Sequence, residues 1–94
     1  MMPHLIVSYD VVDDNRRNRL AKLLKGYLQR VQKSVFEGEL TARRHHTLRS
    51  RIEKVIDQDE DSVRIYLLCR RCVPALEIVG TGVPVEPPDE DIFV

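Results

Sequence analysis

The sequence has little of several features that often indicate a class of protein. Its 94 residues include no tryptophan and only two cysteines, and aromatic side chains make up 5% of it. No apolar run reaches the roughly eighteen residues that suggest a transmembrane helix, so we expect no membrane partner. The first residues, Met-Met-Pro-His, lack the charged and apolar regions of a secretion signal. We therefore expect a small cytoplasmic protein with a single core.

The two cysteines form one Cys-x-x-Cys motif, at Cys69 and Cys72. A redox motif of this kind is expected to open a helix in a thioredoxin-like setting, whereas this one follows an apolar strand pattern and precedes Pro74. A structural zinc site takes four ligands, and the sequence has no second cysteine pair to complete one. We expect reduced thiols with a structural role.

The net charge of the chain is zero, but its charges are segregated. Residues 15–54 hold twelve Lys and Arg against three Glu, a local net charge of +9, whereas residues 55–61 and 86–91 are acidic. A protein polarised in this way can bind a polyanion on one face without being basic overall. Solvated helix faces explain the same pattern equally well.

The fold is organised around residues 4–10, His-Leu-Ile-Val-Ser-Tyr-Asp. The branched and aromatic side chains of this stretch predict a buried strand that carries Asp10 to the rim of a sheet. Arg16, Arg17 and Arg19 lie at the start of the helix that follows. A carboxylate at such a rim can hold a hard cation, and nearby arginines can receive phosphate. The alternative is that Asp10 only caps the turn after the strand.

Two amphipathic helices are predicted further along the chain. The first is capped by the acidic residues 13–14 and ends at Gly26, with leucines at helical spacing between them. The second follows Thr41, a good N-cap, and buries one stripe of apolar residues. His45 and His46 are adjacent, so they lack the i, i+4 spacing of a helical metal site, and we expect both at or near the surface.

The remaining segments predict strands and turns. Residues 29–40 alternate and form either one bent strand or a hairpin, and the topology favours a reversal within them. Residues 63–69 predict a strong strand and residues 76–79 a shorter one. The acidic turn at residues 57–62 resembles a calcium loop at its first positions but lacks the turn glycine and the final glutamate, so we expect an exposed connection.

This order of elements predicts an α+β fold, a ferredoxin-like split βαβ sandwich whose antiparallel sheet has two helices on one face. We assign residues 1–82 to this domain and residues 83–94 to a C-terminal tail, whose apolar end adds an edge strand for dimer or partner contact. The other sheet face is left for a second copy. An isologous homodimer would bring each Asp10 toward its symmetry mate.

The sequence resembles a known family, the small CRISPR-associated adaptation endonucleases called Cas-two. The resemblance covers nearly the whole chain, and its most specific part is residues 30–38, Arg-Val-Gln-Lys-Ser-Val-Phe-Glu-Gly. It also rests on Tyr9-Asp10 and on Asp14-Asn15 with Arg17 and Arg19, and on residues 61–66, Asp-Ser-Val-Arg-Ile-Tyr.

The resemblance implies a ferredoxin-like homodimer in which two copies of Asp10 face a divalent cation such as Mg²⁺. It implies a metal-dependent endonuclease that hydrolyses phosphodiesters of RNA or DNA and acts in spacer acquisition with a CRISPR integrase subunit. The alternative is a non-catalytic architectural dimer that binds duplex DNA and bridges integrase subunits. The expected phosphate-binding residues are Arg16, Arg17, Arg19 and Arg30, with Arg43 and Arg44 behind them.

Three further residues are candidates for supporting roles. Tyr9 precedes Asp10 in the strand, Ser34 could orient a water or a substrate oxygen, and Phe36 could stack on a base or pack at an interface. For Ser34 and Phe36 we favour packing.

Overall fold

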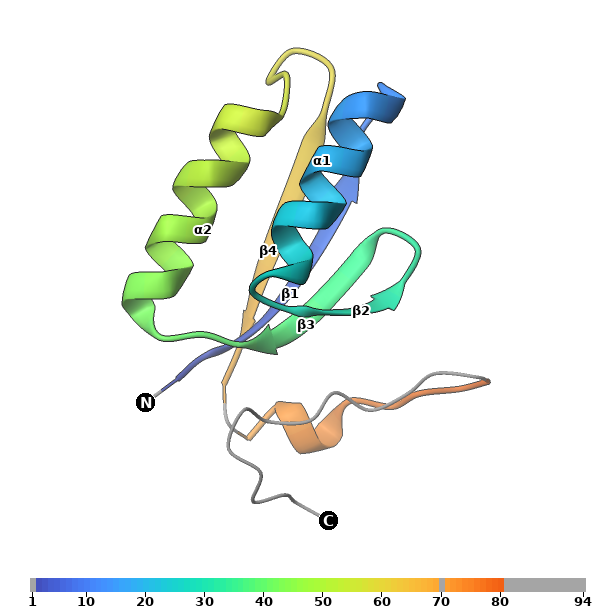
Figure 1. Cartoon of the computed structure of the whole chain (residues 1–94). Helices are drawn as coiled ribbons and strands as arrows, with labels where there is room; N and C mark the ends of the chain where they lie inside the picture. Colours follow the sequence, from blue (N-terminus) through green and yellow to red (C-terminus); the bar gives the residue numbers. More distant parts are fainter. Residues whose placement is uncertain (1, 70, 81–94) are drawn as a thin grey trace.

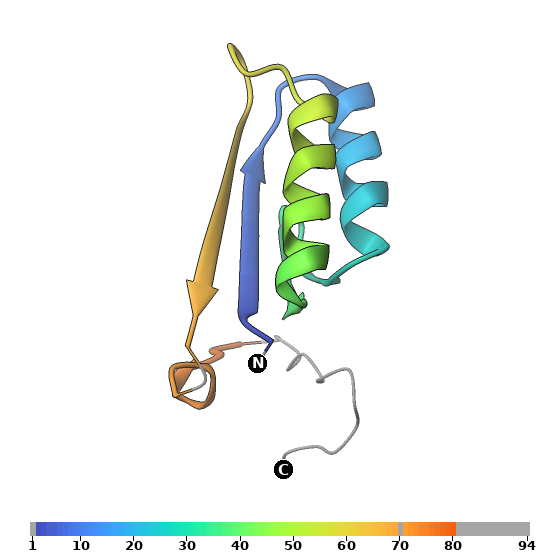
Figure 2. The ribbon, with the colours of Figure 1, turned by 90° about the vertical axis from the view of Figure 1, so that its left-hand side faces the viewer.

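The computed structural model describes residues 2–69 and 71–80 of the chain. The elements run β1 (His4–Asp10), α1 (Asp14–Lys25), β2 (Gln29–Gln32), β3 (Val35–Glu39), α2 (Ala42–Val55) and β4 (Ser62–Leu68), followed by the 3₁₀ turn η1 (Val73–Ala75). The strands form one antiparallel sheet in the order β2-β3-β1-β4. Figure 1 shows both helices packed side by side, and Figure 2 shows them on the same face of the sheet. The predicted ferredoxin-like α+β fold is confirmed.

Both helices begin where their capping residues predict, and α1 also ends where Gly26 predicts. The side chain of Asp13 accepts a hydrogen bond from the backbone N–H of Arg16 at 2.9 Å, and Gly26 follows the last residue of α1. At the start of α2, the Thr41 hydroxyl accepts one from the backbone N–H of Arg44 at 3.2 Å. These side chains satisfy backbone donors that have no partner inside the helix.

The core lies between the sheet and the helices. Side chains alternate along β1, so that Leu5, Val7 and Tyr9 face the helices and are buried. The buried helix residues above them include Leu20, Leu24, Leu48 and Ile52, and β3 contributes Phe36, which is fully buried.

Residues 29–40 form a hairpin rather than one bent strand. β2 and β3 pair antiparallel around a turn at Lys33 and Ser34, with an irregular register between Arg30 and Gln32. Alternation was compatible with either structure, because both give side chains a period of two. Tertiary pairing determines that the chain turns here, because β3 pairs antiparallel with β1.

The sheet face opposite the helices is uncovered in the described part of the chain (Figure 2). The alternation of β1 places Ile6, Ser8 and Asp10 on this face, and the register aligns Ile6 with Tyr66 of β4. Ile6 is half-buried and Tyr66 is 46% exposed. This small apolar centre, bordered by Glu37 of β3 across from Ile6, is the part of the open sheet face best suited to contact another molecule.

The strand predicted at residues 76–79 is wrong. This segment follows η1 as irregular chain, with Ile78 45% and Val79 93% exposed. A strand needs a neighbouring strand to pair its backbone groups, and none of the described strands pairs with this segment. The C-terminal edge strand predicted within residues 83–94 lies outside the described residues. In residues 2–69 and 71–80, no helix has the length and apolar character needed to cross a membrane.

Candidate functional site

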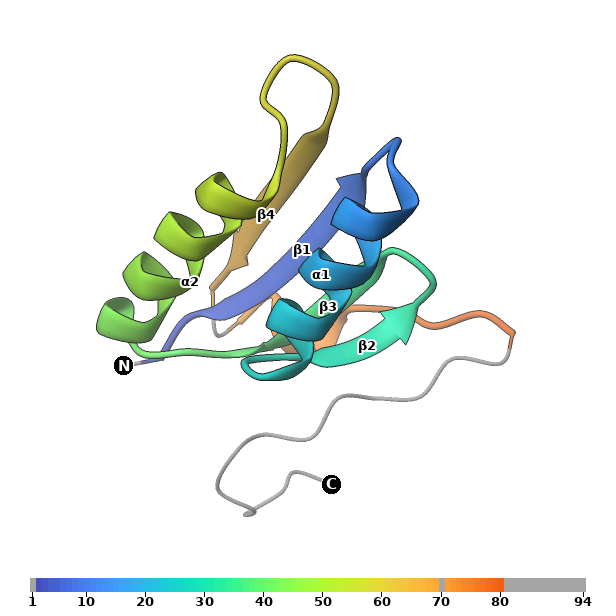
Figure 3. The same ribbon diagram turned by 45° about the horizontal axis from the view of Figure 1, so that its top comes forward.

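Asp10 ends β1, an interior strand of the sheet, as an exposed side chain. The start of α1 and the loop between α2 and β4 lie at this same end of the molecule, as Figure 3 shows from above. On the other side of Asp10, the backbone N–H of Tyr9 donates to the carbonyl of Ser34 at 3.1 Å, which holds the β2–β3 turn beside it. Three connections therefore meet around one carboxylate.

The β2–β3 turn is fixed by two side chains that the sequence singled out. The Lys33 carbonyl accepts a hydrogen bond from the Arg30 guanidinium at 2.9 Å and one from the Tyr9 hydroxyl at 3.4 Å. The Arg30 guanidinium also lies over the Phe36 ring, 5.3 Å from its centroid. Arg30 thus has a defined position over Phe36, on the helix side of the sheet and therefore on the opposite face from Asp10, while its side chain stays exposed.

Phe36 supports this turn from inside the core. It is fully buried and its ring stacks against that of Tyr9, with centroids 6.2 Å apart. A ring without solvent access has no face to offer a base, so its position favours the packing role over base stacking. Ser34 is half-buried in the turn, and its carbonyl, rather than its hydroxyl, makes the contact with β1.

The arginines at the start of α1 differ in what they contact. Arg17 donates to the Val11 carbonyl at 3.0 Å and pairs with Asp14 through its other guanidinium nitrogen, which places its charge beside the loop after Asp10. Arg19 is exposed on the helix surface. Both remain predicted phosphate ligands.

Arg16 has a different environment, because it binds the loop before β4. Its Nε donates to Asp61 at 2.8 Å and its Nη2 to Glu60 at 3.0 Å. The Asp61 side chain, fully buried, also accepts from the backbone N–H groups of Val12 at 3.1 Å and Asp57 at 2.9 Å. Asp61 therefore connects the loop after Asp10 to the loop before β4. Arg16 strengthens this connection, and the N–H groups that it uses are the ones with which it would bind a phosphate.

The prediction of a wholly exposed connection at residues 57–62 is wrong at Asp61. The acidic pattern there gave no reason to distinguish one carboxylate from its neighbours. The pairing of β1 with β4 distinguishes Asp61. Asp10 aligns with Ser62, so Asp61, the residue before Ser62, must lie beside the loop that follows Asp10. Only the strand register, and not the local sequence, shows that Asp61 meets Val12 and Arg16.

The contacts of Asp61 also determine how it responds to acid. Its hydrogen bond to Arg16, supported by backbone donors, lowers the pKa of Asp61 from 3.8 to about 2, against an opposing effect of desolvation. The same hydrogen bond raises the pKa of Arg16. Because the folded pKa of Asp61 lies below its unfolded value, its stabilising effect is complete above about pH 4 and is lost as the pH falls toward 2.

We expect Asp61→Asn to lower the melting temperature at pH 7 by roughly 5 °C or more, because the amide cannot pair with Arg16 and leaves buried donors poorly satisfied. The difference in melting temperature between this variant and the unmodified protein should become smaller between about pH 4 and pH 2, where Asp61 takes up its proton. Asp59→Asn, on an exposed side chain of the same loop, serves as the control. Calorimetric melts across this pH range check the prediction, and a constant difference down to pH 2 would contradict it.

The donor set for a metal ion is incomplete in one chain. Within the described residues, no group of three or more His, Cys, Asp or Glu side chains is arranged to hold an ion. Asp10 supplies one oxygen ligand group on the uncovered sheet face, and Mg²⁺ is commonly held by one or two carboxylates with several waters. The residues therefore fit a divalent cation if a second copy of the chain contributes the second Asp10.

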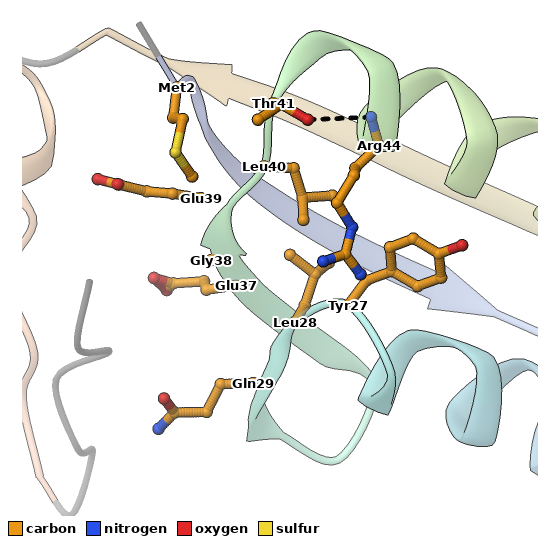
Figure 4. Close-up of a pocket in the computed structure, with 10 residues that line it drawn as sticks. All are labelled: Met2, Tyr27, Leu28, Gln29, Glu37, Gly38, Glu39, Leu40, Thr41 and Arg44. Atoms are coloured by element: carbon orange, nitrogen blue, oxygen red, sulfur yellow. Dashed lines mark hydrogen bonds between the residues drawn. The ribbon is translucent and has the colours of Figure 1, made fainter. Parts of the chain in front are cut away.

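An open hollow of about 370 Å³ lies at the other end of β3 from the β2–β3 turn. Figure 4 shows Leu28 and Leu40 in its wall, with Arg44 beside the Tyr27 ring, 4.7 Å from the guanidinium carbon to the ring centroid. Arg44, a second-rank phosphate candidate, lines it, but Asp10 and the four arginines predicted first do not. Asp10 lies instead on the open surface at the end of β1.

Comparison with known proteins agrees with this architecture. The family described as "CRISPR associated protein Cas2" matches residues 2–75. The chain is 43% identical over 90 residues to the "CRISPR-associated endoribonuclease Cas2 1" of Chloroflexus aurantiacus, covering 95% of this chain and 96% of that protein.

Solved structures give the same result. Streptococcus pyogenes Cas2 at pH 6.5 superposes with a TM-score of 0.74 at 35% identity, covering 82% of this chain and 99% of that one. A chain of a partial Cas6-RT-Cas1–Cas2 complex superposes with a TM-score of 0.71 at 33% identity, covering 83% and 91%. The chain described here belongs to the Cas2 family of CRISPR-associated proteins.

Proposed function

We propose that this protein is a CRISPR-associated, metal-dependent endonuclease that works as a homodimer, with one Asp10 from each copy at a shared divalent cation such as Mg²⁺. The observation that supports it most directly is the position of Asp10, exposed at the end of β1 on the uncovered sheet face, with the anchored side chain of Arg17 beside the loop that follows it. The relative in Chloroflexus aurantiacus is called an endoribonuclease, so we take RNA as the first substrate to test.

Each group has a distinct role in this proposal. The two Asp10 carboxylates would hold the cation, which when bound activates water and neutralises charge on the leaving oxygen. Arg17 would bind a phosphate beside the cleaved bond and Arg30 a phosphate farther along the strand, because their guanidinium groups are already positioned by carbonyl oxygens. Asp61 and Arg16 would act as positioning residues that keep the loop after Asp10 in place.

The uncovered sheet face supports a dimer. It combines a partly exposed apolar centre, which includes Tyr66, with the Asp10 end of β1. A two-fold axis through this face would bury the apolar centre and place both Asp10 side chains on the same side of the interface. A single copy of the chain would supply only one of the two Asp10 carboxylates of the proposed cation site.

Tyr66→Glu should weaken dimerisation by about tenfold or more, because it places a charge in the apolar centre of the interface. His46→Glu introduces the same charge on the exposed surface of α2 and is the matched control. Sedimentation velocity over a range of protein concentrations measures the dimerisation of both variants. Equal association of the two variants would place the interface elsewhere.

We expect binding to single-stranded or duplex nucleic acid to be insensitive to sequence and to weaken steeply as salt is raised. Arg30→Gln should reduce the slope of log affinity against log salt by about one, since one phosphate contact is lost. Arg49→Gln, at an exposed α2 residue paired with Glu53 across 3.7 Å, is the control and should leave the slope unchanged. Fluorescence anisotropy titrations measure the slopes. An affinity that does not change with salt would refute the arginine assignment.

An architectural role is the second candidate function, and the match to a chain in a Cas6-RT-Cas1–Cas2 complex favours it specifically. In this role the dimer would hold duplex DNA across its basic surface and bridge Cas1 integrase subunits during spacer acquisition. We propose that residues 83–94, the tail beyond the described residues, provide the contact with that partner. The two functions can coexist in one dimer.

A further inference from the structure

The chain leaves β4 through a tight turn that brings its two thiols together. The Sγ atoms of Cys69 and Cys72 lie 3.0 Å apart, and both residues are exposed. Backbone hydrogen bonds hold this arrangement: the N–H of Cys72 donates to the Cys69 carbonyl at 2.9 Å, and the N–H of Val73 donates to the same oxygen at 3.3 Å. η1 follows directly, beyond the end of the sheet (Figure 2).

This geometry does not fit thiols that serve only to fill a core. Cysteines with a packing role are buried and unreactive, whereas these two side chains are open to reagents in solution. Neither belongs to the hydrophobic core between the sheet and the helices. Two thiols held in contact on a surface are arranged for a reaction in which one sulfur attacks a disulfide and the other resolves the product.

The two sulfurs are not equivalent. When one of them is ionised, the thiol of Cys72 can donate its hydrogen to the thiolate of Cys69, and backbone donors of the turn add to this effect. These hydrogen bonds lower the pKa of Cys69, and the pKa of Cys72 is raised by the same contact. Cys69 therefore has the larger thiolate fraction near neutral pH, and the thiolate is the attacking species.

We propose that Cys69 and Cys72 form a thiol–disulfide exchange site, in which Cys69 attacks a small-molecule disulfide and Cys72 closes an intramolecular disulfide. In the first step the Cys69 thiolate forms a bond to one sulfur of glutathione disulfide and expels one glutathione thiolate. In the second step the Cys72 thiolate attacks the Cys69 sulfur and expels the other. The protein dithiol is oxidised, and one glutathione disulfide is reduced to two glutathione thiols. This site is separate from Asp10 and does not depend on the nuclease proposal.

The experiment incubates the full-length folded protein with glutathione disulfide and follows its mass and its remaining thiols with time. The unmodified chain should lose both thiols as a monomer without retaining glutathione. Cys72→Ser should retain one glutathione on Cys69, because the resolving sulfur is absent. Cys69→Ser should react about tenfold more slowly than Cys72→Ser, because the backbone donors of the turn that lower the pKa of Cys69 remain in Cys72→Ser, where the serine hydroxyl can still donate to the Cys69 thiolate. Circular dichroism confirms that both serine variants are folded, as expected for exposed positions.

Two results would overturn the proposal. Retention of glutathione on both cysteines of the unmodified protein would show that the second step does not occur. Equal rates for the two serine variants would show that the fold does not distinguish Cys69 as the attacking sulfur. The same reaction rates measured in urea give the values for the unfolded chain. The two serine variants should then react at the same rate, because the turn is unfolded.

Discussion

Asp10→Asn is expected to reduce metal-dependent cleavage of RNA by about 100-fold or more while leaving the fold unchanged. The amide keeps the shape of the side chain but removes the negative charge that holds a divalent cation. Because Asp10 is exposed at a strand end and packs against nothing in the core, its replacement should not affect stability. The measurement is initial cleavage rate against Mg²⁺ concentration, with melting temperature recorded for each variant.

Asp59→Asn is the matched control, since it removes one exposed carboxylate from the same end of the molecule without touching β1. Cleavage that continues unchanged in Asp10→Asn would remove Asp10 from the active site. Testing the same variant for spacer integration with the proposed Cas1 partner separates the two candidate functions. Lost cleavage with intact integration would assign the protein an architectural role in that process.

Phe36→Ala should reduce the free energy of unfolding by about 3–5 kcal/mol, a large share of the stability of a domain of this size. Phe36 is fully buried between the sheet and the helices, and it stacks with Tyr9 on one side. Its loss would leave a cavity and also remove the ring on which the Arg30 guanidinium rests.

Phe36→Leu retains most of the buried volume and should reduce the free energy of unfolding by less, about 1–2 kcal/mol. This variant can therefore still be measured if the alanine variant does not fold. Urea unfolding monitored by circular dichroism gives both values. A loss below about 1 kcal/mol in Phe36→Ala would contradict the structure, because it would mean that the ring is not packed in the core.

The sequence predicts most of the fold because its local signals agree with one another. Caps at Asp13 and Thr41, the glycine after α1 and the alternation of β1 each act over a few residues, and each is confirmed. Segment 76–79 fails for the opposite reason. An apolar alternating stretch forms a strand only when another strand is available to pair with it, which is a property of the tertiary structure.

The candidate site shows the same division. The positions of Asp10 at the end of a strand and of Arg17 in the first turn of the next helix could be predicted from local patterns, and their functional roles stay predictions. The role of Asp61 could not, because it depends on the pairing of Asp10 with Ser62 across strands separated by most of the chain. The contact between the Cys69 and Cys72 sulfurs likewise depends on a turn that the motif alone does not specify.

The central claim is that two copies of the chain hold one divalent cation between their Asp10 side chains. Titration of the dimer with Mn²⁺, followed by electron paramagnetic resonance, counts bound ions directly. We predict one ion for every two chains in the unmodified protein, and none at the same concentrations in Asp10→Asn. One ion bound per chain, or binding that survives the replacement of Asp10, would contradict the account.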